Sequence, residues 1–386
     1  MRDHLDVLIV GGGPVGAALA LKLRDSGLDV GLIEARPDAP GADPRALALS
    51  WGSCRELDRL GTWAAIRSRT PIETVHVSQQ GALGRVKLSH EEMQLPALGY
   101  VVNFGELQRA LHEVLTTGGI EYRTGAQLVD LKTLAHYALA TIEMHGQRQQ
   151  VTAALVVLAD GGRSVELVPD LQRYSRPYRQ QAVIADVHAD RPNGGVAYER
   201  FSQSGPIALL PRGQGFALVW TQPEQHAPTV LAWDDARFLA ELQQAFGDRA
   251  GQFVAVGPRA AFPLYLRQLS RNHAQRVALI GNAAQALHPV AGQGFNLGLR
   301  DALDLAQLIL ATPRTQIGAA PMLQQFGRNR RLDANLTVGF TDLLIQLFDQ
   351  HPAWLQRMRS AGLLALDLAP GLRRAFTNRM IFGSRI

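Results

Sequence analysis

The sequence predicts an α/β protein with a mainly antiparallel insert, and three observations lead to this fold class. Strand-like runs at 5–10 and 30–33 flank a helix-forming stretch at 17–23, an alternation that predicts a parallel sheet with right-handed crossovers. Residues 180–268 hold short apolar runs separated by Gly and Pro, which is typical of antiparallel sheets. The apolar strand at 276–280 returns to the α/β style, so the first domain is predicted to be discontinuous.

The remaining elements follow in chain order. Helical patterns cover residues 50–60, 105–115 and 234–246, each with apolar side chains recurring at helical spacing. Residues 74–88 form a predicted strand pair, with its turn at 79–81. Short strands are expected near Tyr122 and Val129, at 138–142 and 155–158, and at 182–187, 207–210 and 216–220.

These elements predict three parts of the chain. The first domain comprises residues 1–72, 101–178 and 270–330, the second comprises 73–100 and 179–269, and 331–386 form a C-terminal helical region. That last region mixes apolar clusters with arginines. It therefore fits either helices packed on the first domain or a basic amphipathic surface on an anionic membrane.

Composition limits the function classes. The chain has 386 residues, 46% of them hydrophobic and 19% charged, which is ordinary for a globular protein with a large core. A net charge of +5 is too small and too dispersed to predict nucleic-acid binding. Cys54 is the sole cysteine, and the histidines lack metal-ligand spacing, so we expect no disulfide and no metal. Without an apolar leader or an 18-residue apolar run, a cytoplasmic protein is expected.

A glycine motif, Gly11-x-Gly13-x-x-Gly16, lies between the first strand and the first helix. Its glycines permit a sharp turn, a close approach of backbone N–H groups to a pyrophosphate, and tight helix–strand packing. The helix N-terminus presents unpaired N–H groups and a positive dipole end to such an anion. Glu34, 18 residues after Gly16, ends the second strand and can accept hydrogen bonds from ribose hydroxyls. The motif predicts a tightly held dinucleotide whose adenosine lacks a 2′-phosphate.

Two more motifs follow apolar strands. One is Asp160-Gly161-Gly-Arg-Ser164, and the other runs from Gly281-Asn282 to Asp301. In the latter, a proline-glycine turn opens a helix, whose positive end would suit the negative N1–C2=O edge of a reduced flavin. Asn282 could hydrogen-bond a ribityl hydroxyl.

In this order and spacing, the three motifs resemble the FAD-dependent class A aromatic hydroxylases built like p-hydroxybenzoate hydroxylase. Residues 44–50 and the run 287–301 are similar to the ubiquinone-biosynthesis hydroxylases. Asn282 and Gln285 replace the usual Asp and His of that group and resemble the branch that acts on 2-octaprenyl-6-methoxyphenol. The resemblance also leads us to expect an arginine soon after Ser164, where this chain has Val165 and Glu166.

The resemblance implies a Rossmann-like FAD-binding domain, an antiparallel substrate domain and C-terminal helices. It further implies hydroxylation of a hydrophobic prenylated phenol by O2 and transiently bound NAD(P)H, through a flavin C4a-hydroperoxide. The implied cofactor-binding residues are Gly11, Gly13, Pro14, Val15, Gly16, Glu34, Ala35, Arg45, Asp160, Gly161, Gly281, Asn282, Pro289, Gly292, Gly294, Phe295 and Asn296. The helix start at Pro289, Gly292, Gln293 and Gly294 is expected to face the isoalloxazine.

Several readings stay open. Phe262 and Pro263 resemble an element on the substrate side, but a strand-edge role fits them equally well, and His288 fits either a functional or a structural role. Trp220 is a further substrate candidate, although a core position suits it better. Alternative functions are a prenyl reductase, a hydroxylase of another small aromatic, or a non-catalytic flavoprotein in a quinone-synthesis complex. Contact with that complex or with the inner face of the membrane, and a homo-oligomer, are left open.

Overall fold

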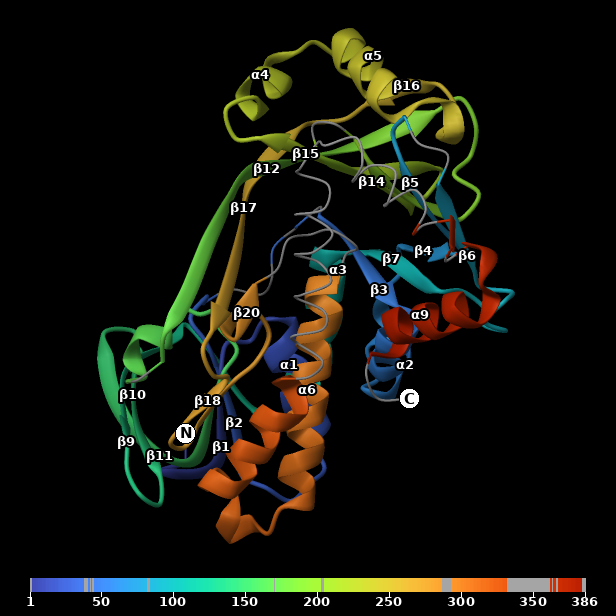
Figure 1. Cartoon of the computed structure of the whole chain (residues 1–386). Helices are drawn as coiled ribbons and strands as arrows, with labels where there is room; N and C mark the ends of the chain where they lie inside the picture. Colours follow the sequence, from blue (N-terminus) through green and yellow to red (C-terminus); the bar gives the residue numbers. More distant parts are fainter. Residues whose placement is uncertain are drawn as a thin grey trace.

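The computed structural model contains two large sheets joined by a long two-stranded ribbon (Figure 1). The residues it describes are 2–37, 41, 43, 45–81, 84–169, 171–202, 205–286, 293–331, 362, 364–365 and 367–383. Within these ranges, no helix has both the length and the apolar character needed to cross a bilayer. The description below concerns these residues.

The first sheet is the predicted parallel one. Its strand order is β18 (His273–Ala274), β19 (Val277–Leu279), β11 (Gln147–Leu158), β1 (His4–Val10), β2 (Val30–Glu34) and β8 (Glu121–Thr124), with β10 (Ala138–Met144) pairing β11 and β9 (Ala126–Thr133). The pairs from β19 to β8 are parallel, whereas β9, β10 and β18 pair antiparallel. The predicted parallel α/β arrangement of the N-terminal unit is therefore present, with an antiparallel extension.

Alternation along β1 explains how this sheet is covered. Val7 and Ile9 pack against helices α1 (Pro14–Leu23), α3 (Phe104–Thr117) and α6 (Gln293–Ala311). Leu8 and Val10 point to the opposite face, where they pack against apolar side chains of β9 and β10. Because both faces of β1 are buried, its sequence is a continuous apolar run rather than an alternating one.

The second sheet is the predicted antiparallel insert. Its order is β20 (Gln285–Ala286), β17 (Ala260–Leu269), β12 (Arg173–Ala189), β15 (Gly215–Pro223), β14 (Pro206–Arg212), β13 (Val196–Phe201), β5 (Thr74–Gln79) and β6 (Arg85–Ser89), with β16 (Phe253–Val256) beside β12. Its pairs are antiparallel except β5 with β13. Helices α4 (Ala227–Ala232) and α5 (Asp235–Phe246) cover its outer face (Figure 1).

A small third sheet contains β3 (Ala46–Ser50), β7 (Gly99–Asn103) and β4 (Arg69–Ile72). Helix α2 (Trp51–Arg59) follows β3, and the C-terminal helix α9 (Pro370–Phe382) packs against α2. The domain boundary predicted at residue 100 falls inside β7, and β20 pairs with β17 of the second sheet rather than with the first sheet. The division into domains therefore stays a prediction.

The predicted helices and strands are present with shifted ends. The helices expected at 50–60, 105–115 and 234–246 are α2, α3 and α5, and the strand pair at 74–88 is β5 with β6. Helix α1 begins at Pro14 rather than at residue 17, because proline lacks only an N–H that the first turn leaves unpaired anyway. Helix α4 and the small sheet were not predicted. Most of the C-terminal region lies outside the described residues.

Candidate cofactor and substrate cleft

A cleft of about 1150 Å³ lies where the parallel strands end and the second sheet begins. In open α/β sheets, ligands bind at the carboxyl ends of the strands. The predicted residues that line this cleft are Gly11, Gly13, Pro14, Val15, Glu34, Ala35, Arg45, Asp160, Gly161, Asn282, Gly281, Gly294, Phe295, Phe262 and Pro263. Pro289, Gly292 and His288 lie outside the described residues, as does the side chain of Gln293.

The three glycines of the first motif have different structural roles. Gly11 has a φ of +109°, and a Cβ there would stand 2.6 Å from the backbone nitrogen of Asp160. At Gly16, a Cβ would collide with the carbonyl oxygen of Gly11. Gly13 differs, because a Cβ there meets nothing within 4 Å and would project into the cleft. Gly11 and Gly16 thus close the turn, while Gly13 leaves space at the N-terminus of α1 for an anion.

Glu34 is the acceptor at the tip of β2. Its side chain is buried and accepts from the backbone N–H of Gly12 at 2.8 Å and from the backbone and Nε of Arg36 at 3.0 Å. Burial works to raise the pKa of Glu34, but the hydrogen bonds and charge of Arg36 and the Gly12 N–H outweigh it, so the pKa lies below its ordinary value. An ionised carboxylate at this place can accept from ribose hydroxyls.

Asp160 organises the loop of the second motif. Its Oδ1 accepts from Gly162 N at 2.9 Å and its Oδ2 from Ser164 N at 2.8 Å, which holds the loop in a turn at the cleft wall. Arg173 of β12 donates to the Gly162 carbonyl at 2.9 Å and pairs with Glu166 at 3.4 Å. The guanidinium that contacts this loop therefore comes from β12 of the long two-stranded ribbon formed by β12 and β17, and not from the position after Ser164.

The third motif is tied to the interior by an ion pair. Gly281, with a φ of +60°, donates its backbone N–H to Asp301 Oδ2 at 2.9 Å. The other oxygen of Asp301 accepts from Arg330 Nε at 2.7 Å, and both side chains are buried. Gly294, at the start of α6, faces open space. The strand end and the helix start of the motif are thus held beside the cleft by buried groups.

Asn296 differs from the other predicted cofactor residues, and its role toward the cofactor stays a prediction. Its side chain is only 2% exposed and is not among the described cleft-lining residues. Its Oδ1 accepts from Ser50 N at 2.9 Å, and its Nδ2 donates to Ala48 O at 3.0 Å. The side chain of Asn296 therefore joins α6 to β3.

Trp220 lies in the core position that the sequence favoured over a substrate role. Its ring packs against Trp233 and Phe238 between the second sheet and helices α4 and α5. Its neighbour Val219 lines the cleft instead, because successive side chains of a strand point to opposite faces. Phe262, which does line the cleft, is 42% exposed.

Sequence reasoning missed several cleft residues. Arg36 lines the adenosine end beside Glu34, and the ring of Phe104 lies 4.7 Å under the guanidinium of Arg45, which also pairs with Asp43. On the second sheet, alternating apolar side chains line the cleft. The sequence signal for these residues is the alternation of side chains along each strand, but alternation does not tell which face of the sheet lies toward the cofactor.

The residues at the nucleotide end fit FAD. The groove combines Gly13, which leaves space at the N-terminus of α1, with the ionised carboxylate of Glu34. At the third motif, Gly294 leaves space in the cleft wall. Fold and cleft together define a flavoprotein-type protein with a second, antiparallel sheet across the cleft.

Comparison with known proteins agrees with this class. The profile described as FAD binding domain matches residues 4–341, and the chain belongs to this family of FAD-binding monooxygenases. Ubiquinone hydroxylase UbiL of Rhodospirillum rubrum is 35% identical over 383 residues, covering 96% of this chain and 88% of the relative. The 3-demethoxyubiquinol 3-hydroxylase of Escherichia coli is 31% identical over 383 residues, covering 96% of each.

Solved structures agree on the fold. The p-nitrophenol 4-monooxygenase PnpA of Pseudomonas putida DLL-E4 superimposes with a TM-score of 0.79 at 18% identity, covering all of both chains. The monooxygenase PqsL of Pseudomonas aeruginosa gives 0.77 at 22% identity, covering 94% of this chain and all of that one. The predicted resemblance to flavin-dependent hydroxylases and the predicted FAD cofactor are therefore confirmed.

Proposed function

We propose that this protein hydroxylates the aromatic ring of a prenylated phenol in ubiquinone biosynthesis, using NAD(P)H and O2. The observation that carries the proposal is the pairing of an FAD groove with an apolar sheet face across one cleft. The names of the two relatives, which print ubiquinone hydroxylation, support the pathway. We further propose a substrate like 2-octaprenyl-6-methoxyphenol, on the basis of Asn282 and Gln285.

In this proposal, FAD supplies the redox and oxygen-transfer chemistry, and the chain supplies binding, orientation and exclusion of water. The N-terminus of α1 at Gly13 holds the pyrophosphate, and Glu34 accepts from the ribose. The start of α6 at Gly294 would direct its positive end at the flavin edge that carries negative charge when reduced. The apolar face of the second sheet excludes water from the reacting ring.

Oxygen incorporation tests the reaction. Purified holoenzyme, NAD(P)H, ¹⁸O2 and a methoxyphenol with a short prenyl tail should give a product heavier by one labelled oxygen, with matching NAD(P)H consumption. A reductase would instead yield a product without label. A non-catalytic flavoprotein would show no phenol-stimulated NAD(P)H oxidation at all. The position of the new hydroxyl, read by NMR of the product, tests the proposed branch.

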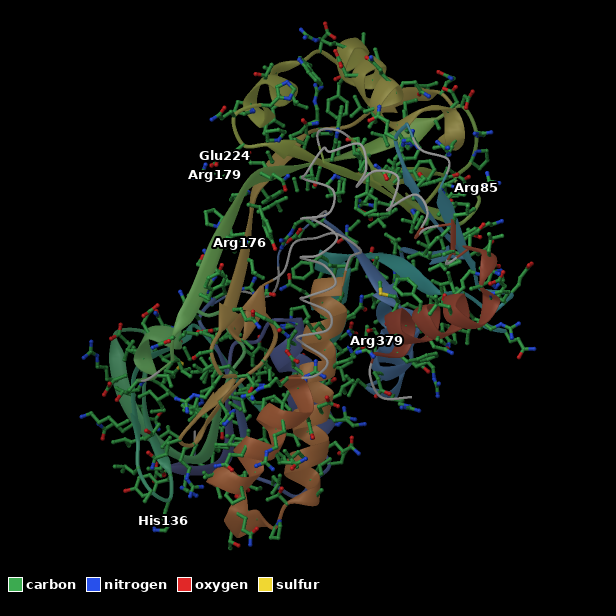
Figure 2. All side chains as sticks on the ribbon, viewed as in Figure 1. Arg85, His136, Arg176, Arg179, Glu224 and Arg379 are labelled. Carbon is green, nitrogen blue, oxygen red and sulfur yellow. The ribbon has the colours of Figure 1, made fainter. Side chains whose placement is uncertain are left out.

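We also propose that the C-terminal helical face lies against an anionic membrane surface, where a prenylated substrate would be found. Leu364, Leu368 and Leu372 are 49%, 73% and 59% exposed. Arg374 and Arg379 of α9 are exposed as well, and Figure 2 labels Arg379 on this helix. Such a combination of apolar and basic side chains suits the headgroup region.

Vesicle binding tests this surface. The double variant Leu368→Ser and Leu372→Ser should reduce co-sedimentation with phosphatidylglycerol-containing vesicles about tenfold. Each exposed leucine contributes a few methylene groups to burial, and each such group is worth about 0.8 kcal/mol. The matched control, Leu134→Ser and Leu310→Ser, changes two exposed leucines elsewhere and should sediment like the parent protein. An equal loss of vesicle co-sedimentation in both double variants would contradict the membrane contact.

A further inference from the structure

The second sheet turns a mainly apolar face toward the cleft, with Asp186 and Arg212 also lining it. On β12, Val183 and Val187 belong to the core under α4 and α5. The alternate residues Ala182 and Ile184 therefore point to the other face and line the cleft. These inward side chains are apolar although the cleft lies in front of them, and apolar side chains left open in a cleft commonly mark a ligand surface.

Strand register places these side chains in one row across the sheet, which is called the lane below and comprises Ala260, Ile184, Val219, Ala217 and Leu210. Ile184 lies opposite Ala260 on β17 and opposite Val219 on β15. Two residues further along β15, on the same face, Ala217 lies opposite Leu210 of β14. All five residues line the cleft. Because neighbouring strands are about 4.8 Å apart, the four strands carry the lane over roughly 14 Å.

The surroundings of the lane differ in chemistry. At one end, Phe262 and Leu264 of β17 lead toward the third motif, because Gln268 on the same strand pairs with Gln285. Along one side, Asp186 lies opposite Ala217 and forms an ion pair with Arg212 at 2.8 Å, and an apolar chain placed over this pair would remove water from both charges. A ring held near Phe262 would therefore have its substituent directed across the apolar middle of the sheet.

Resting on the proposed function, we propose that the isoprenoid tail of the substrate lies along Ala260, Ile184, Val219 and Leu210. These side chains then determine the preference for a tailed over an untailed phenol. Each buried methylene group strengthens binding about fourfold, so even a partly buried tail is decisive for affinity. The small side chains Ala260 and Ala217 leave the width that a methyl-branched chain needs.

Equilibrium binding to the FAD-loaded protein, without NAD(P)H, tests the lane. The ligands are a methoxyphenol with a three-isoprene tail and the same phenol without a tail, each titrated by the change in flavin absorbance. The parent protein should bind the tailed ligand at least about 100-fold more tightly. Val219→Trp, which fills the middle of the lane, should lower this ratio at least tenfold.

Two further variants keep the result interpretable. Val254→Trp makes the same substitution on β16, where Val254 is 59% exposed, and should leave the ratio unchanged. Val219→Thr keeps the shape but replaces one methyl group by a hydroxyl, and it should lower the ratio a fewfold even if the tryptophan variant loses FAD. Equal weakening of both ligands, or an unchanged ratio in both Val219 variants, would overturn the lane.

The outcome also separates the lane from the proposed function. If the ratio falls in the Val219 variants while the parent enzyme incorporates no labelled oxygen, the lane stands and the hydroxylase proposal fails. If labelled oxygen is incorporated and the ratio does not respond, the hydroxylase stands and the lane is wrong.

Discussion

The two sides of the cleft are built by different means. The nucleotide side consists of backbone: glycines at fixed spacing, a helix N-terminus, and Glu34 held by N–H groups. The side formed by the second sheet consists mainly of apolar side chains from strands far apart in the sequence. A backbone site tolerates almost no substitution at its glycines, whereas an apolar face tolerates changes that keep its volume. The cofactor is therefore specified by motif, and the substrate by shape.

Gly13→Val is expected to have the largest effect on this contrast. Its side chain would project into open cleft space at the pyrophosphate site, so FAD retention and activity should be lost while the apoprotein keeps its melting temperature. Absorbance of the purified protein and thermal unfolding measure the two quantities. Gly16→Val is the matched control, because its side chain would collide with the Gly11 carbonyl and should impair folding itself. A fully yellow Gly13→Val protein would remove the assigned cofactor groove.

Glu34→Gln should weaken FAD binding by about 10- to 100-fold, since a hydrogen bond to a charged group is worth about 1.5–3 kcal/mol. The pH dependence follows from the lowered pKa of Glu34. Its ionised form contributes stability that is fully present above the ordinary pKa of 4.5 and is lost as the pH falls through the lower pKa of the folded state. When FAD release is measured from pH 7 down to pH 3, the parent protein should release more FAD as the pH falls through this lower pKa. Glu34→Gln should lack this pH-dependent release, and the same pH dependence in both proteins would assign it to another group.

Asn296→Ala should lower stability by about 1–3 kcal/mol, because it leaves Ser50 N and Ala48 O without their buried partner. Urea unfolding of the apoprotein measures this cost. FAD affinity corrected for folding should change less than threefold, which would distinguish a tie between α6 and β3 from a direct ligand contact. A large loss of affinity without a loss of stability would support the sequence-based assignment.

The smallest effects separate the two faces of the second sheet. Phe262→Ala should raise KM for the phenol about tenfold, because its ring lines the cleft. Trp220→Phe should cost roughly 1–2 kcal/mol of stability through its core contacts and leave KM unchanged. If Trp220→Phe alters KM and Phe262→Ala does not, the two faces have been assigned the wrong way round.

These residues also mark what sequence can predict. Gly11, Gly13, Gly16 and Glu34 were found because their spacing reports a local turn, and local geometry is written in consecutive residues. The contacts of the Asn296 side chain were not predicted, because its partners, Ser50 and Ala48, lie about 250 positions earlier. No local pattern indicates such a contact.

The lane residues were missed for a related reason. Periodicity shows that Val219 and Trp220 point to opposite faces of a strand, but not which face meets the cofactor. That choice depends on how helices α4 and α5 cover the outer face of the sheet. Likewise, Arg173 could not be assigned to the Gly162 loop before the position of β12 was known.

The pairing of β1 with distant strands affects how this chain folds during its synthesis. Val7 of β1 pairs with Leu155 of β11, and Val156 of β11 pairs in turn with Val277 of β19. During synthesis from the N-terminus, the glycine turn therefore emerges long before the strands that complete its sheet. Distant pairings of this kind fold slowly and expose unpaired edges meanwhile. We expect FAD to be taken up after synthesis of the chain is nearly finished, and apoprotein to accumulate when the flavin is scarce.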